Sequence, residues 1–116
     1  MNIVVKHVYD GPGHDDGTRV LVDRIWPRGL RKSDAHLDYW LKDVAPSTEL
    51  RKWYGHDPEK FREFADRYRH ELNTTEGQDA LQQLRDAATG KKMTLLTATK
   101  DIDHSQAAVL AELLGD

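Results

Sequence analysis

Three short apolar runs in the chain have the pattern of buried β-strands. Residues 3–5, followed by Val8, are β-branched and predict a first strand. Residues 18–24 predict a second strand, and we expect both of its faces to be covered because positions 20–22 are continuously apolar. Residues 93–98 predict a third strand.

Glycine, proline and polar residues mark the connections in the first half. Residues 10–17 contain three glycines and a proline, which predicts a flexible surface loop. The second strand is predicted to end at Trp26 and Pro27, because proline lacks an N–H and favours extended geometry in the residue before it. Ser33 can cap a short turn or helix, and the loose alternation over residues 37–44 fits a strand or a helix.

Capping residues and apolar spacing predict the helices that follow. Ser47 is expected to cap a short helix, with Glu49 in its first turn and Gly55 at its end. Asp57 and Pro58 open the next helix as N-cap and first residue. Its apolar stripe consists of Phe61, Phe64, Ala65, Tyr68 and Leu72.

Two further helices are expected near the C-terminal end of the sequence. Thr75 and Gln78 have the spacing of a capping box, and Gly90 is expected to end that helix. Asp101 or Asp103 can cap the last helix. Strands separated by helices are typical of an α/β domain, so we expect a small, mostly parallel sheet packed by helices in one compact domain, residues 1–116.

The composition is that of a folded globular domain. Of the 116 residues, 38% are hydrophobic and 32% are charged. No apolar run approaches the ~20 residues of a membrane span, and the first residues lack a signal-peptide pattern, so we expect no membrane partner. The chain has no cysteine, which excludes disulfides, thiol catalysis and thiolate metal sites and favours a cytoplasmic location.

Positive charge is concentrated in one segment of an acidic chain. The net charge is −3, which argues against a generic nucleic-acid binder, yet residues 17–32 carry four arginines and one lysine against Asp23 alone. Ligands of open α/β sheets bind beyond the carboxyl ends of the strands, where Arg24, Arg28 and Lys100 could converge near a helix N-terminus. The segment therefore predicts an anion site or a set of solvated arginines.

Asp23 and His104 are the candidate acid–base groups. Among arginines, Asp23 is expected to keep a low pKa and to act as a general base, an arginine positioner or a structural ion-pair partner. His104 follows Lys100 at the start of the last helix and acts as an acid or base or faces solvent.

Aromatic residues near the basic ones have two interpretations. Trp26 and Trp53, the latter beside Arg51, support a ligand or belong to the core. The run from His14 to Asp16 lacks paired-histidine spacing, so we expect no metal site, and the absence of a phosphate-binding glycine loop gives no reason to expect a cofactor.

Three segments of the chain resemble one family. GTRVLVDRIWPRG (residues 17–29), APSTELRKW (45–53) and TLLTATKD (94–101) resemble the YeaO-like branch of the domain-of-unknown-function 488 family. The resemblance covers nearly the whole chain and implies a compact bacterial α/β domain with no assigned reaction. The recurring polar and aromatic residues of that family correspond here to Arg19, Asp23, Arg24, Trp26, Arg28, Arg51 and Lys100.

One departure from that pattern lies in the last helix. Family members often have Asn-His-Ala there, whereas this chain has Ser105, Gln106 and Ala107. Glutamine can donate and accept hydrogen bonds but does not shuttle protons near neutral pH. A role that needs an imidazole at position 106 is therefore not expected, although His104 lies nearby.

These observations support three hypotheses about function. The first is a cytosolic domain that binds an anionic small molecule or nucleotide through Arg19, Arg24, Arg28, Arg51 and Lys100. The residues leave open whether it is also an enzyme. The second is a module for single-stranded nucleic acid, weakly supported by the charge. The third is a scaffold or partner-binding domain whose arginines are structural and paired with Asp23.

Overall fold

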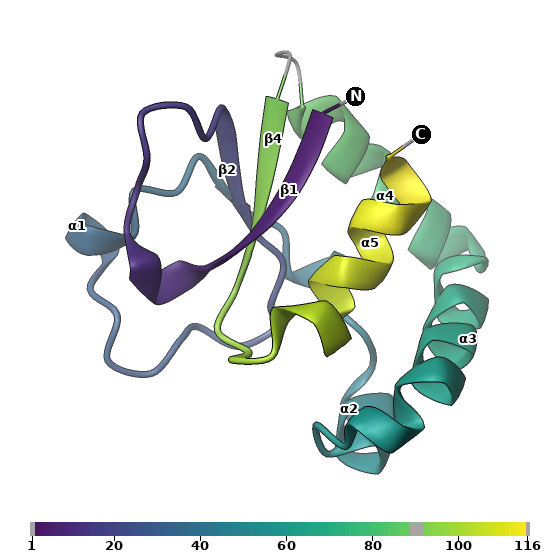
Figure 1. Ribbon diagram of the computed structural model, residues 1–116. Coiled ribbons are helices and arrows are strands. Elements are labelled where there is room, and N and C mark those ends of the chain that lie inside the picture. Colours follow the sequence, from purple (N-terminus) through teal and green to yellow (C-terminus); the bar gives the residue numbers. More distant parts are fainter. Residues whose placement is uncertain (1, 89–91, 116) are drawn as a thin grey trace.

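A parallel four-stranded sheet forms the centre of the computed structural model, which describes residues 2–88 and 92–115 (Figure 1). Its strands, in spatial order, are β1 (Asn2–His7), β4 (Lys92–Thr97), β2 (Thr18–Leu21) and β3 (Tyr39–Trp40). The first and last strands of the sequence are thus paired, and the predicted parallel α/β architecture is confirmed.

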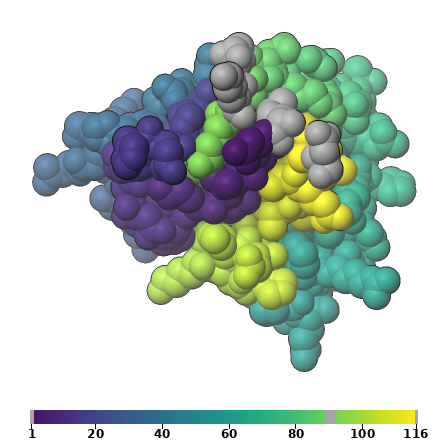
Figure 2. Space-filling view, turned by 45° about the horizontal axis from the view of Figure 1, so that its top comes forward, coloured from purple at the N-terminus to yellow at the C-terminus, as the bar shows by residue number. Residues whose placement is uncertain are grey.

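The helices are α1 (Lys32–Ala35), α2 (Thr48–Tyr54), α3 (Phe61–Leu72), α4 (Thr75–Ala87) and α5 (Gln106–Leu114). Single 3-10 turns precede or link them at Val8–Asp10, Lys42–Val44, Pro58–Lys60 and Ile102–His104. Helix α5 lies beside β1, so the first strand and the last helix share one surface (Figure 2). None of the helices in the described residues is long and apolar enough to cross a membrane.

Successive residues of β2 pack alternately into two separate apolar clusters, one on each face of the sheet. Val20 packs with side chains of α2–α5 in the larger cluster, and Leu21 packs with Val8 and Leu96 in the smaller one. Side chains of the loops, including Trp26, complete the smaller cluster on the face opposite α2–α5. The prediction that both faces of this strand are covered is confirmed, because all of these strand residues are fully buried.

The second strand is shorter than predicted. It ends at Leu21 rather than Arg24, and therefore well before Pro27. The Val22 N–H still donates to the Leu96 carbonyl at 3.1 Å, but the next residue, Asp23, directs its side chain to the end of β4. The strand therefore ends before the proline, and the residues just beyond it contact the end of β4.

Several helix caps agree with the sequence and others are shifted by one or a few residues. Ser47 caps α2 by accepting a hydrogen bond from Leu50 N, and Gly55 ends that helix in the left-handed region at φ +56°. Asp57 caps the 3-10 turn that leads into α3. The expected apolar stripe of α3 is buried except for the partly exposed Phe61.

Three of the predicted caps are wrong. Thr74, not Thr75, caps α4, and Ser105, rather than either aspartate, caps α5. Ser33 lies inside α1, whose N-cap is Arg31 without a side-chain hydrogen bond. Threonine, serine and aspartate are all good caps, so the composition of these segments does not distinguish neighbouring positions. The predicted end of α4 at Gly90 falls outside the described residues.

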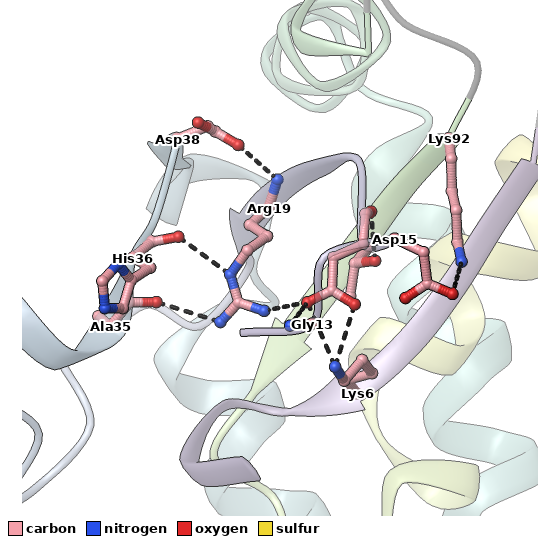
Figure 3. A network of polar contacts seen from close by, with 10 residues as sticks. Lys6, Gly13, Asp15, Arg19, Ala35, His36, Asp38 and Lys92 are labelled. Carbon is pink, nitrogen blue, oxygen red and sulfur yellow. Dashed lines mark hydrogen bonds and ion pairs between the residues drawn. The ribbon is translucent and has the colours of Figure 1, made fainter. Parts of the chain in front are cut away.

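A polar network fastens the loop of residues 10–17 to the amino end of the sheet (Figure 3). The Asp16 carboxylate is 3% exposed; it pairs with Arg19 and accepts hydrogen bonds from Lys6 Nζ at 3.0 Å and Gly13 N at 2.8 Å. The Gly13 N–H, with Lys6 and Arg19, lowers the pKa of Asp16 to about 2 against the opposing effect of burial. The end of the loop is anchored, and its flexibility elsewhere stays a prediction.

Gly17 completes this anchor because no other residue fits there. Its φ is +68°, and a Cβ atom would lie 2.3 Å from the Lys92 carbonyl oxygen of β4. The side chain of Thr94, also on β4, donates to the Asp16 carbonyl at 2.7 Å. The loop backbone is therefore held against the central strand.

Candidate functional site

A cavity of about 600 Å³ opens at the carboxyl edge of β2 and β4. The segment after β2, the region around α2 and the segment from β4 to α5 each contribute to its walls. This is the edge at which the sequence places a ligand, and its volume lies within the range of small-molecule sites.

Three of the predicted arginines line this cavity. The Arg24 guanidinium is fixed by the main chain, since Nε donates to the Pro46 carbonyl at 3.2 Å and Nη2 to the Ala45 carbonyl at 2.9 Å. Arg28 and Arg51 have no side-chain hydrogen bond or ion pair with any described residue. Within the part of the chain that the structure describes, the cavity therefore contains two guanidinium groups without protein partners and a third with unused N–H groups.

Lys100 lies in a neighbouring cavity of about 350 Å³. That cavity shares Tyr54, Thr99 and His104 with the larger one, so the two spaces adjoin. The Tyr54 hydroxyl donates to the His104 carbonyl at 2.6 Å, and burial, assisted by Asp101 and Asp57, raises the pKa of Tyr54. Lys100 is thus close to the arginines but not part of their wall.

Asp23 lies in the large cavity and contacts none of the arginines directly. Its Oδ1 accepts from Thr97 Oγ1 at 2.8 Å and from Gln106 Nε2 at 2.5 Å, and its Oδ2 accepts from Ala98 N at 2.8 Å. Burial raises the pKa of Asp23, outweighing these hydrogen bonds and the charge of Arg51. The low pKa expected for Asp23 is therefore wrong, because burial has the larger effect.

His104 lines both cavities and is oriented by a carboxylate. Its Nδ1 lies 2.7 Å from Asp101 Oδ2, and its ring meets the Phe61 ring edge-on at 5.1 Å between centroids. This pairing leaves Nε2 as the ring atom available to a ligand. An acid–base role for His104 stays a prediction.

Two predicted residues lie away from the cavity. Arg19 is 5% exposed at the opposite end of β2, where its guanidinium pairs with Asp16 and donates to the carbonyls of Ala35 and His36 at 3.1 and 2.9 Å (Figure 3). It is a structural cation. Trp53 does not line the cavity; Lys60 Nζ lies 5.2 Å and the Arg67 guanidinium 4.1 Å from its ring centroid.

Trp26 does line the cavity, and neighbouring groups fix its ring. Its indole N–H donates to the Leu30 carbonyl at 2.7 Å. The ring of Trp40 packs against it edge-on at 5.4 Å, and the Trp40 N–H donates to the Asp23 carbonyl at 2.7 Å. The two tryptophans therefore support the loop that carries Arg24 and Arg28, and a ligand-supporting role for Trp26 stays a prediction.

Gln106, noted in the sequence only as a departure from the family pattern, is a site residue. It contacts Asp23 from the first turn of α5, across 83 positions of sequence. Lys52 and Tyr54 also line the cavity, and their position in the basic and aromatic run beside Arg51 is the signal that indicates them. Residues 2–88 and 92–115 contain no group of three or more side chains able to hold a metal ion.

The fold and site define a parallel α/β domain with a cationic cavity at the carboxyl edge of its sheet. The sequence model of DUF488-N3i, described as the inactive DUF488-N3 subclade, matches residues 2–116. The chain belongs to this bacterial family, in its YeaO-like branch, which confirms the expected relationship.

Two relatives illustrate the extent of the similarity. The uncharacterized protein Rv3073c of Mycobacterium tuberculosis is 53% identical over 110 residues, which cover 95% of this chain and 91% of that protein. The uncharacterized protein YeaO of Escherichia coli is 42% identical over 114 residues, covering 98% and 97% of the two chains. No solved structure matches the chain.

Proposed function

We propose that this protein binds an anionic small molecule or nucleotide in the cavity at the carboxyl edge of the sheet. The proposal rests on one observation: Arg28 and Arg51 line an open cavity, and neither has a carboxylate partner among the described residues. Guanidinium groups bind phosphates and carboxylates through paired N–H donors. Arg24, held by two backbone carbonyls, provides a fixed positive charge beside them.

The scaffold hypothesis requires the arginines to be paired with Asp23. The carboxylate of Asp23 instead accepts hydrogen bonds from Thr97, Ala98 and Gln106, which favours a binding role for the arginines. The nucleic-acid hypothesis loses support from Trp53, because this ring already packs with Lys60 and Arg67 and does not line the cavity. Both observations support the small-molecule proposal.

We propose a binding role rather than a covalent reaction. The chain has no cysteine nucleophile, and the family model is described as inactive. Asp23 and His104 then act as polar partners of the ligand. A cytoplasmic location, the expectation for a chain without cysteine, is part of the same proposal.

Isothermal titration calorimetry with AMP and with inorganic phosphate tests the proposal. Arg28→Ala and Arg51→Ala should each weaken binding by roughly ten- to hundredfold, since a charge-assisted hydrogen bond contributes about 1.5–3 kcal/mol. Arg62→Ala is the matched control, because Arg62 is exposed on α3 and does not line the cavity. Failure of both anions to bind, or equal affinity in the wild type and the two cavity variants, would refute the proposal.

A further inference from the structure

The side of the cavity formed by Asp23 and Gln106 presents hydrogen-bond acceptors. A carboxylate has about four lone-pair positions, of which Thr97 and Gln106 occupy two on Oδ1 and Ala98 N occupies one on Oδ2. Gln106 uses one N–H on Asp23, and its Oε1 accepts no hydrogen bond from a described residue. One position on Asp23 Oδ2, the Gln106 carbonyl oxygen and the second Gln106 N–H are thus open to a ligand, and a hydroxyl group, which both donates and accepts, matches this set.

The guanidinium groups in the same cavity present donors only. Arg24, Arg28 and Arg51 donate hydrogen bonds and cannot accept them. A ligand that fills the cavity therefore meets donors beside the arginines and acceptors beside Asp23 and Gln106. An inorganic anion matches only the first set, and a second anionic group near Asp23 would be repelled by the carboxylate.

The position of the acceptors is fixed before a ligand arrives. Thr97 and Ala98 hold the Asp23 carboxylate at the end of β4, and Gln106 holds it from the first turn of α5. Preorganised polar groups discriminate well between ligands because they need no rearrangement on binding, and because leaving them unmatched costs free energy. The arrangement is suited to recognition of a donor group at a definite distance from the anion.

We propose that Asp23 and Gln106 form a subsite for hydroxyl groups, so that the ligand is an anion with a hydroxylated carbon skeleton, as in a sugar phosphate. This inference rests on the proposed function, because the anionic group must be held by the arginines. A cavity of about 600 Å³ has room for such a molecule beyond its phosphate.

Two phosphate esters with three carbons each, one with hydroxyl groups and one without, distinguish the contribution of the arginines from that of Asp23 and Gln106. The full-length, ¹⁵N-labelled protein is titrated with glycerol 3-phosphate and with n-propyl phosphate and followed by NMR. Glycerol 3-phosphate should bind about tenfold or more tightly, since a hydroxyl donates to a charged acceptor. It should also shift the Gln106 side-chain amide signals, which n-propyl phosphate should leave in place.

Variants assign the preference to the subsite. Asp23→Asn should reduce the tenfold preference to about threefold or less, because a neutral acceptor forms a weaker hydrogen bond. If that variant does not fold, Gln106→Met provides the same test with Asp23 intact. Arg51→Ala should weaken both esters by the same factor.

The outcomes distinguish the subsite from the proposed function. Equal affinity for the two esters, with the Gln106 amide signals unmoved, overturns the hydroxyl subsite and leaves anion binding intact. A preference that persists in both Asp23→Asn and Gln106→Met also overturns it. Failure of both esters to bind overturns the proposed function together with the subsite.

Discussion

Replacement of Arg19 by methionine tests whether this arginine is structural. Methionine keeps an unbranched side chain of similar length but removes the guanidinium. Three contacts are lost, with the Asp16 carboxylate and with the carbonyls of Ala35 and His36. All of them are at the amino end of the sheet, and none of the residues involved lines the cavity.

The structure suggests the size of the effect. Removing one partner of a buried ion pair costs about 3–5 kcal/mol. The lower half of this range is expected for Arg19→Met, because Asp16 keeps Lys6 Nζ at 3.0 Å and Gly13 N at 2.8 Å. A loss of about 3 kcal/mol is a large part of the roughly 5–15 kcal/mol that stabilises a typical domain, and it corresponds to a fall in Tm of about 10 °C or more.

Urea denaturation at pH 7, followed by the fluorescence of the three tryptophans, measures the free energy of unfolding. Arg69→Met is the matched control, because the ion pairs of Arg69 with described residues, at 3.3 Å to Asp66 and to Glu112, are exposed. This variant should lose about 1 kcal/mol or less. A loss below about 1 kcal/mol for Arg19→Met would refute the structural role, as would a loss of anion affinity without a loss of stability.

Three further predictions concern the carboxylates and one helix cap. Because the pKa of Asp16 is lowered, its ionised form stabilises the fold above pH 3.8. In urea titrations, the wild type should be about 2 kcal/mol more stable than Asp16→Asn, and this difference should disappear as the pH falls from about 4 to 2. A difference that stays constant with pH would contradict this. Because the pKa of Asp23 is raised, ionisation of its carboxyl group opposes folding, and the contribution of Asp23 to stability is largest below pH 3.8 and decreases as the pH rises. Titration of the carboxyl ¹³C signals should give Asp23 a midpoint above 3.8 and Asp16 one near 2. The reverse order would count against both assignments. Ser47→Ala removes the cap of α2 and a hydrogen bond to Glu71, and thermal unfolding should show a loss of stability of about 1–2 kcal/mol. The control variant Thr48→Ala, at an exposed position, should lose less than about 0.5 kcal/mol. Equal losses would refute the capping role.

Local signals in the sequence predicted the presence of α2–α5 and both ends of α2, but not the end of β2. Ser47 and Gly55 bound α2 because capping depends on residues a few positions apart. Just beyond the end of β2, in contrast, Asp23 accepts a hydrogen bond from Ala98 N, which joins residues 75 positions apart. No spacing rule within residues 18–24 contains that contact.

The charge count located the basic segment but grouped residues that the fold separates. Arg19 and Arg24 are five residues apart, which is about 16 Å along extended chain, so they lie toward opposite ends of the sheet. Asp16, three residues before Arg19, is the local signal for its structural pairing. A basic residue at the start of a strand should therefore be separated from those at its end before a site is inferred.

Helical geometry explains the positions of Arg51 and Trp53. Residues two apart on a helix do not share a face. Arg51 lines the cavity, and Trp53 packs with Lys60 and Arg67. Their separation could have been predicted from the sequence, whereas the contact of Gln106 with Asp23 needs the pairing of β2 with β4 and the path of the chain into α5.

Determination of a crystal structure of the protein with AMP would test most directly the central claim that the cavity binds an anion. The account predicts that the phosphate lies at the carboxyl edge of the sheet, within hydrogen-bonding distance of the Arg28 and Arg51 guanidinium groups, with Arg24 still on the carbonyls of Ala45 and Pro46. A phosphate bound elsewhere, or a cavity in which Arg28 and Arg51 pair with protein carboxylates and exclude the ligand, would contradict it.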